Sequence, residues 1–211
     1  MGMTGGLVRA TLEEIARLRK HPSELPEFLD CGIWAPPNRE VRAKGMLGWL
    51  LRLTPVRIYE NDPDAVPPPG AEHAAIRPNI DLDKAWEPLH FLLTGTALGG
   101  EEPACYLACG GEELVEEPDD EQSAYSSIRV LTPEQVAAFD RYLTALTIDE
   151  LRRRFDVNRM VELRIYSKRR STKAPTDDDG TLDHLIEAFE DLRTFVRETA
   201  ASGAAAVAYL T

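Results

Sequence analysis

Residues 79–95 read NIDLDKAWEPLHFLLTG, a segment that opens on polar turn-forming residues and closes on an apolar helical run. Asp83 is a good helix N-cap because its side-chain oxygen can accept a hydrogen bond from the first free N–H groups of a helix. Gly95 is a good stop because glycine adopts the left-handed conformation that follows many helices. Pro88 lies inside the pattern, where proline removes one backbone hydrogen bond. We therefore predict a helix up to Thr94 that either kinks at Pro88 or begins there.

Short strands and amphipathic helices are predicted on both sides of this segment. Thr132 with Gln135, and Thr147 with Glu150, have the capping-box spacing that marks the start of a helix. Helices are expected at residues 11–20, 23–30, 132–146, 147–155 and 182–202. Strands are expected at residues 7–10, 104–108, 127–131, 161–166 and 205–210. This interspersed pattern predicts an α/β fold, namely a three-layer αβα sandwich with a small mixed sheet and helices on its faces.

Prolines dominate residues 33–80, which contain eight of them. Proline forbids long regular structure across most of this region. A helical turn or two is compatible with residues 46–53, and residues 62–70 read as a surface loop of polyproline character or as a recognition segment for a partner. We therefore expect one domain over residues 1–211, with a long proline-rich irregular insertion at about 33–80.

The charge of the chain excludes several classes of partner. Its 211 residues include 36 acidic and 24 basic side chains, which gives a formal net charge of −12. Such a field repels nucleic acid and anionic membrane surfaces, and it favours a basic protein partner. The basic cluster at residues 168–173 is followed by three aspartates at 177–179, so a solvated loop is favoured there over an anion site.

The apolar runs and the three cysteines of the chain bear on its location. Neither a leader peptide nor a membrane-spanning run is apparent, so we expect a cytoplasmic protein with reduced thiols. Cys105 and Cys109, if they lie on a straight strand, are about 13 Å apart at a rise of ~3.3 Å per residue. In that arrangement they cannot share a zinc ion or a disulfide, and they are expected to be buried apolar thiols.

One candidate pocket concentrates the side chains that could carry chemistry: Asp81, Asp83, Lys84, Trp86 and His90. In the structural interpretation Asp83 caps the helix, Trp86 is core, and His90 bonds inside the fold or packs on Trp86. In the functional interpretation Asp81, Asp83 and His90 form a polar cluster in a cleft, with His90 as acid or base. A metal site lacks a third ligand of defined spacing, so neither a metal nor a cofactor is expected.

Several strings of this chain resemble the YfbM-like family of uncharacterised bacterial proteins. They are the N-terminal Met-Gly-Met before a short strand, LDKAW at residues 82–86, LHFLLTG at 89–95, LTPEQV at 131–136, and the terminal amphipathic helix that runs into a strand. The resemblance implies a single three-layer αβα domain and no known reaction, substrate or cofactor. Pro88 departs from the uninterrupted helix expected there.

Three functional hypotheses follow. The leading one is a non-catalytic cytoplasmic binding or interaction protein, of which an immunity-type protein that neutralises a basic toxin is one instance. The alternative is a small-molecule enzyme of hydrolase type, with a polar site around Asp81, Asp83, Trp86 and His90. The third is a purely structural or regulatory subunit. No P-loop, nucleophile elbow or zinc-binding string supports a more specific activity.

Overall fold

The computed structural model describes residues 4–29, 38–41, 58–61, 77–114, 127–165 and 181–210. The chain divides into one unit of residues 1–29 with 77–211 and a second unit of residues 30–76. In the second unit, the described residues form a two-stranded antiparallel sheet of β2 (Asn38–Val41) and β3 (Ile58–Asn61). The helical turn predicted at residues 46–53 and the loop predicted at 62–70 lie outside the described residues.

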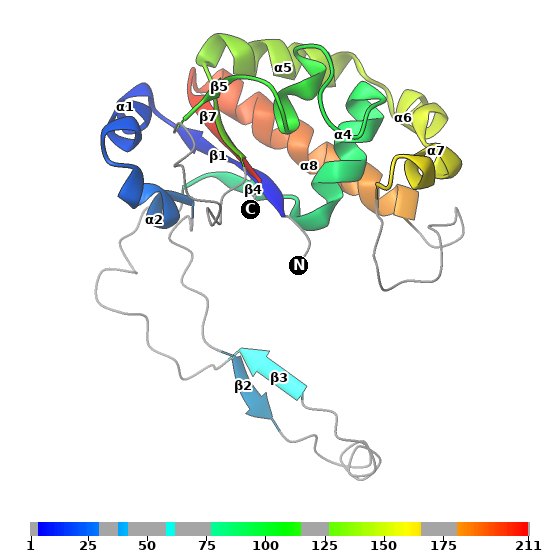
Figure 1. Cartoon of the computed structure of the whole chain (residues 1–211), viewed down its shortest axis with the longest axis horizontal. Coiled ribbons are helices and arrows are strands. Elements are labelled where there is room, and N and C mark those ends of the chain that lie inside the picture. The colour runs from blue at the N-terminus through cyan, green and yellow to red at the C-terminus, as the bar shows by residue number, and fades with distance from the viewer. Residues whose placement is uncertain are drawn as a thin grey trace. The chain divides into compact units, whose positions relative to one another are not determined.

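A five-stranded sheet forms the centre of the larger unit (Figure 1). Its order is β4 (Asn79–Asp81), β1 (Gly5–Ala10), β7 (Ala205–Leu210), β6 (Ser127–Leu131) and β5 (Glu112–Glu113). The strands nearest the two ends of the chain, β1 and β7, therefore lie side by side in the middle of the sheet.

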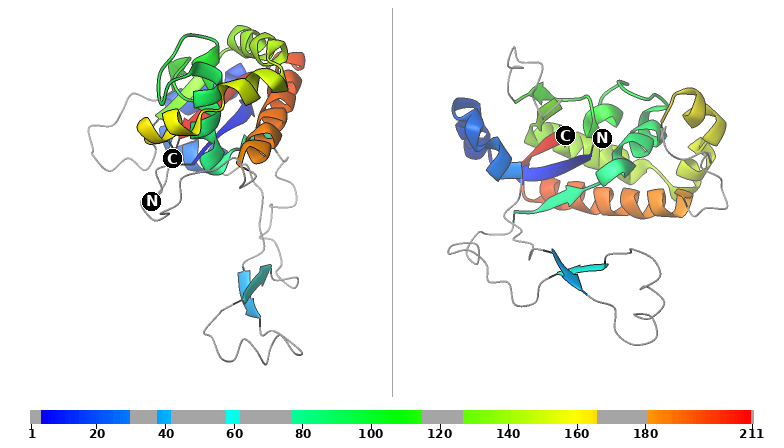
Figure 2. Two further views of the ribbon diagram at one scale, coloured as in Figure 1. Left: turned by 90° about the vertical axis from the view of Figure 1, so that its right-hand side faces the viewer. Right: turned by 60° about the horizontal axis from the view of Figure 1, so that its bottom comes forward.

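The α/β class is confirmed. We expected a mixed sheet of parallel and antiparallel strands, and this expectation is wrong. Every neighbouring pair of strands in it is antiparallel. Between β6 and β7 the chain runs out along α5 (Pro133–Ala145), turns through α6 (Ile148–Arg154) and α7 (Val157–Glu162), and returns along α8 (Thr181–Ala201) (Figures 1 and 2). Because an out-and-back pair of helices returns the chain to the end of the sheet that it left, the next strand pairs antiparallel.

The main hydrophobic core lies between one face of the sheet and the helices. Leu7 of β1 and its directly paired residue Ala208 of β7 contribute to it. From the helices it includes Leu89 and Leu92 of α4 (Trp86–Thr94), Phe139 and Leu143 of α5, and Leu185, Phe189 and Leu192 of α8.

The opposite face of the sheet is buried as well. Alternate side chains of a strand point to opposite faces. Three valines on this other face lie opposite one another in the register and are buried too: Val8, Val130 and Val207. Both faces of the sheet are therefore covered.

Helix starts follow the predicted caps. The Thr132 and Gln135 side chains form the reciprocal capping box at the start of α5, and the Thr147 hydroxyl accepts the N–H of Glu150 at the start of α6. Thr11 and Glu14 form a second reciprocal box at the start of α1 (Leu12–Lys20). The helix predicted at residues 23–30 is a 3-10 turn, Pro22–Glu24, that continues into α2 (Leu25–Leu29).

Two predicted strands are wrong. Residues 104–107 form a 3-10 helix, η4 (Ala104–Leu107), because the Cys105 carbonyl accepts the N–H groups of Ala108, Cys109 and Gly110 and needs no partner strand. The strand predicted at 161–166 begins instead as the last turn of α7, which Asp156 caps through the N–H of Arg159. Within the described residues, no helix is both long and apolar enough to cross a bilayer.

Candidate functional site

The structure separates the five residues of the predicted pocket into an exposed group and a buried group. Asp81 at the end of β4 and Asp83 and Lys84 in the 3-10 turn η3 (Asp83–Ala85) are exposed. Trp86 and His90 of α4 are 6% and 0% exposed. The two aspartates contact each other locally, since the Asp83 N–H donates to Asp81 Oδ1 at 2.8 Å. The residues are thus close in sequence without forming one polar pocket.

Asp83 does not cap α4, which corrects our expectation. Its φ is 43°, it begins η3, and Ala85 stands at the N-cap position of α4 with no side-chain cap. The regular helix begins at Trp86, so Pro88 falls in its first turn, where backbone N–H groups have no intrahelical partner. Proline there removes no helical hydrogen bond, so it gives no reason for the kink that we considered at Pro88.

His90 is a fully buried imidazole. Neither ring nitrogen has a partner of acceptable geometry within the described part of the chain. Burial lowers the pKa of His90, and the nearby backbone of Gly99 opposes this shift only in part. The ring is therefore neutral at pH 7 and does not meet solvent, which is the opposite of what an acid–base group in an open cleft requires.

A glycine-rich loop, residues 95–111, follows α4 and packs beside His90. Gly95 ends the helix in the left-handed conformation with φ 77°, and Gly99, Gly100 and Gly111 also have positive φ. At Gly100 a side chain would meet Thr94 Cγ2 at 2.9 Å and Cys105 Cβ at 3.6 Å. Glycine is required there for both reasons, so the backbone at Gly100 packs tightly against Thr94 at the end of α4 and lies next to Cys105 of η4.

Both cysteines of the 95–111 loop lie in one turn, contrary to our prediction of a straight strand. The N–H of Cys109 donates to the carbonyl of Cys105 at 2.9 Å, and the Gly99 N–H donates to Cys109 Sγ at 3.1 Å. Cys105 is buried, whereas Cys109 is half-buried. Burial raises the pKa of the Cys105 thiol, and the negative charge of Glu102 raises it further.

Tyr106 anchors the same loop to the core. Its hydroxyl donates to Glu102 Oε2 at 2.9 Å, and its ring packs edge-on against Phe139 with centroids 5.9 Å apart. Burial, with the Glu102 hydrogen bond and charge, raises the pKa of Tyr106 to about 12. The tyrosine is therefore a neutral donor and a packing residue at pH 7. The sequence signal that we missed here is the glycine doublet at 99–100, which precedes the turn as the doublet at 110–111 follows it.

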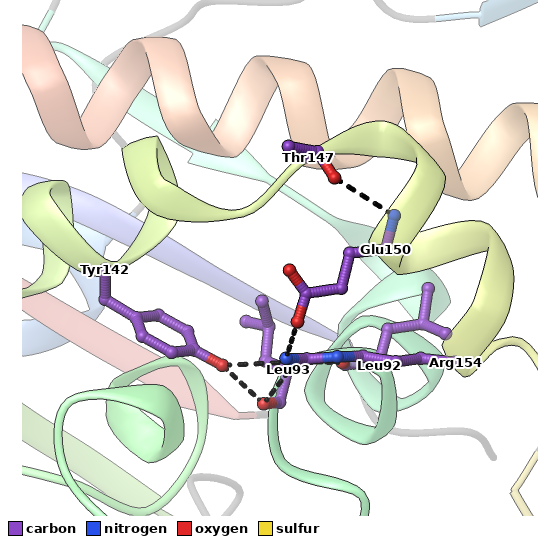
Figure 3. A network of polar contacts seen from close by, with 6 residues as sticks. All are labelled: Leu92, Leu93, Tyr142, Thr147, Glu150 and Arg154. Carbon is purple, nitrogen blue, oxygen red and sulfur yellow. Dashed lines mark hydrogen bonds and ion pairs between the residues drawn. The ribbon is translucent and has the colours of Figure 1, made fainter.

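A polar network holds the other side of the α4 C-terminus (Figure 3). The Tyr142 hydroxyl donates to the Leu93 carbonyl at 2.6 Å, and Arg154 Nη1 donates to the Leu92 and Leu93 carbonyls at 3.1 and 3.3 Å. Glu150 Oε1 accepts from Arg154 Nη2 at 2.5 Å. Since the last carbonyls of a helix have no intrahelical partner, this network completes α4 and fixes where the 95–111 loop begins.

Helix α8 presents a row of acids to solvent, which we call the acidic row: Asp183, Glu187 and Asp191. They are four residues apart and so share one face of the helix. Asp183 lies 3.6 Å from Arg152, while Glu187 and Asp191 have no ion pair among the described residues. Like charges at this spacing destabilise a helix by about 0.2–0.5 kcal/mol per pair. The repulsion between Glu187 and Asp191 is thus unfavourable for α8 by itself.

Groups of three or more His, Cys, Asp or Glu side chains that could hold a metal ion do not occur in the part of the chain that the structure describes.

Comparisons with known proteins identify the family of the chain and one solved structure of similar fold. A family model described as a domain of unknown function (DUF1877) matches residues 1–209. A solved structure, described as the crystal structure of a protein of unknown function YfbM from Escherichia coli, superposes with a TM-score of 0.62 over 99% of each chain at 17% sequence identity. The comparison with curated proteins found no significant match. The resemblance to the YfbM-like family is confirmed, and at this identity the structural likeness is one of fold alone.

Proposed function

We propose that this chain, which belongs to the family of the domain of unknown function DUF1877, is a non-catalytic binding protein whose partner is a basic protein. The family and the structural relative are both described as of unknown function, so the proposal rests on the residues of this chain. An immunity-type protein that neutralises a basic toxin is one form of it. The cytoplasmic location expected from the sequence belongs to the same proposal.

The acidic row of α8 is the observation that carries the proposal. Glu187 and Asp191 stand four residues apart, exposed and without an ion pair in the described residues. A basic partner turns their repulsion into attraction on binding, and the net charge of −12 steers such a partner toward the chain.

The placement of the predicted pocket residues supports binding over catalysis. A hydrolase of the kind considered above needs Asp81, Asp83 and His90 around one substrate, with the histidine able to exchange a proton. The two aspartates are exposed at the start of η3, whereas His90 is fully buried and its pKa is lowered. This geometry offers the alternative function no support, and a purely structural role has no specific observation in its favour.

A pull-down at moderate salt tests the proposal. The bait is the full chain, compared with a Glu187→Gln/Asp191→Asn variant that neutralises two members of the acidic row. The control variant, Glu27→Gln/Glu101→Gln, removes the same charge from two exposed acids outside α8 that have no ion pair within the described residues.

We expect a basic protein that the wild-type chain and the control variant both retain and the row variant loses. Recovery of no basic protein by the wild-type chain contradicts the proposal. Equal loss of the basic protein from the row variant and the control variant also contradicts it, because retention would then depend only on the total charge of the chain.

A further inference from the structure

Within the described residues, strand β4 pairs with a neighbouring strand on one side only. It lies at one edge of the five-stranded sheet, next to β1 (Figure 1). The Arg9 N–H donates to the Pro78 carbonyl, and the Leu82 N–H donates to the Gly5 carbonyl, both at 2.9 Å. In an antiparallel ladder, residues that bond to the neighbouring strand alternate with residues that do not.

This alternation assigns the backbone groups of β4 to two sides. Pro78 and Leu82 bond to β1, so Ile80 midway between them faces β1 as well. Asn79 and Asp81 therefore direct their N–H and carbonyl groups away from β1. These four groups have no partner in the part of the chain that the structure describes. Asp81 is exposed and Asn79 is half-buried, so solvent reaches this edge.

The opposite edge of the sheet offers less. There β5 pairs with β6, and the Leu114 N–H donates to the Ile128 carbonyl at 3.0 Å. The same alternation leaves Glu113 as the described residue of β5 whose backbone points outward. The neighbouring Glu112 is paired with Arg19 of α1 at 2.8 Å. The outer edge of β4 is therefore the better site for a further strand.

Charge decides which strand can add at this edge. A side chain directly opposite Asp81 would have its Cβ about 4.5–5.5 Å away, where opposite charges attract and like charges repel. Asp83 and Lys84, just beyond the strand, are exposed and carry opposite charges. A second copy of the chain is disfavoured, because each copy has a net charge of −12. A segment with Lys or Arg opposite Asp81 is favoured.

The core-facing side of β4 sets the next position of such a segment. Ile80 is 9% exposed and belongs to the main core, whereas the side chains of Asn79 and Asp81 point to the other face of the sheet. A residue opposite Ile80 lies on the core-facing side, and the residues before and after it lie on the other face. A segment that alternates basic and apolar residues fits both faces.

We propose that the outer edge of β4 binds an extended basic segment of a protein partner, which joins the sheet as an added antiparallel strand. The basic charge of the partner rests on the proposed function, and the extended form rests on the register of β4. Every pair in this sheet is antiparallel, so the added strand continues its pattern. Backbone hydrogen bonds supply affinity, and Asp81 selects basic segments while it deters pairing with acidic ones.

Three labelled peptides test the proposal by fluorescence anisotropy with the full chain. All three alternate lysine and valine; one is unmodified, one is N-methylated at its lysines and one at its valines. In an antiparallel pair, the lysine opposite Asp81 exchanges both backbone hydrogen bonds with it, so methylated lysines lack the required donor. We expect lysine methylation to weaken binding about tenfold and valine methylation to change it by less than about twofold. Equal affinities, a larger loss with methylated valines, or no binding overturns the proposal.

Amide hydrogen exchange measured by NMR locates the bound peptide. We expect the unmodified peptide to slow exchange of the Asn79 and Asp81 amide protons about tenfold or more, because both become hydrogen-bonded. Peptide binding that leaves both exchange rates unchanged overturns the proposal. So does dimerisation of the chain alone without peptide binding, since a second copy would then occupy the edge.

The row variant Glu187→Gln/Asp191→Asn separates this proposal from the proposed function. Binding to the acidic row depends on side-chain charge and is insensitive to methylation of the peptide backbone. Affinity that falls in the row variant and is equal for all three peptides overturns the edge site and leaves the proposed function standing. Affinity that falls with methylated lysines and is unchanged in the row variant supports the edge site and contradicts the acidic row.

Discussion

His90 is the residue whose environment is most unusual in this molecule. Its two ring nitrogens are buried without a hydrogen bond in the described residues. Burial of an unsatisfied polar group costs free energy, which destabilises the folded state. Replacing it by an apolar side chain of similar size, His90→Leu, is expected to raise the free energy of unfolding by about 1 kcal/mol. Urea denaturation measures this, with exposed His184→Leu as the control. A loss of stability in His90→Leu would mean that the imidazole has a partner.

We also expect His90 to make the free energy of unfolding depend on pH. The pKa of His90 is lowered from its unfolded value of 6.5, so below about pH 6.5 the unfolded chain binds a proton that the folded chain does not. Stability therefore falls as the pH falls below 6.5, by up to about 1.4 kcal/mol per pH unit. We expect urea unfolding between pH 7 and 5 to show a steeper loss for the wild-type chain than for His90→Leu. Equal slopes would assign the loss to other groups.

At the scale of single residues, the sequence identified which residues to examine but left open whether their side chains are buried or exposed. It singled out Trp86 and His90 as neighbours on one helix face, and both lie on α4. It could not show that both face inward, because a histidine in an apolar run is compatible with a core position and with a cleft. It also treated Asp83 as a cap, whereas Asp81 takes the Asp83 N–H and the helix begins three residues later.

Among the elements, helix α5 allows a direct test of the capping box that the sequence predicts at its start. The Thr132 hydroxyl accepts the N–H of Gln135, and Gln135 returns a bond to the Thr132 N–H. Thr132→Ala is expected to lower the free energy of unfolding by about 1 kcal/mol. Chemical denaturation compares it with Thr194→Ala at an exposed position inside α8, where we expect a change within about 0.5 kcal/mol. An unchanged Thr132→Ala would show that tertiary packing alone sets the start of α5.

The C-terminus of α4 depends on side chains from two other helices. Tyr142→Phe removes the hydroxyl that donates to the Leu93 carbonyl and should lower the free energy of unfolding by about 1 kcal/mol. Arg154→Met should lower it by about 1.5–3 kcal/mol, because Glu150 and two carbonyls lose a charged partner. Since both side chains donate to Leu93, the double variant should deviate from additivity.

Urea denaturation of the two single variants and the double variant measures this coupling, and exposed Arg153→Met is the control for loss of a positive charge. Strict additivity would contradict a shared role at the helix end.

Elements with a strong local signal were predicted, and elements defined by neighbours were not. The caps at Thr132 and Thr147 and the amphipathic pattern of α8 are properties of the local chain, and all are confirmed. The short strands β4 and β5 exist only because β1 and β6 pair with them, so the local sequence carries little trace of them. Residues 104–107 and 161–165 have strand composition, but hydrogen bonds within η4, within α7 and in the turn after α7 satisfy their backbone locally.

On the scale of the whole molecule, the described strands of the five-stranded sheet and the described residues of the main core all come from outside residues 30–76. Both the sheet and this part of the core thus belong to the larger unit. Arg77, where that unit resumes, lies over the Phe28 ring at 4.1 Å and pairs with Glu14 at 2.6 Å, so its two chain ends are close.

We therefore expect residues 30–76 to be replaceable by a glycine–serine linker of about six residues, whose mean reach is about 14 Å. Circular dichroism and urea denaturation should show a folded chain with one cooperative transition. A broad transition would contradict the independence of the larger unit and would support the prediction of one domain over residues 1–211.

The central claim is that the acidic row of α8 is a binding surface for a basic partner. Fluorescence anisotropy of a labelled lysine-rich peptide measures this directly, for the wild-type chain, for Glu187→Gln/Asp191→Asn and for the control Glu27→Gln/Glu101→Gln. We predict that the row variant weakens binding about three- to tenfold while the control changes it by less than about twofold. Equal weakening by the two variants, or no binding by the wild-type chain, would contradict the claim.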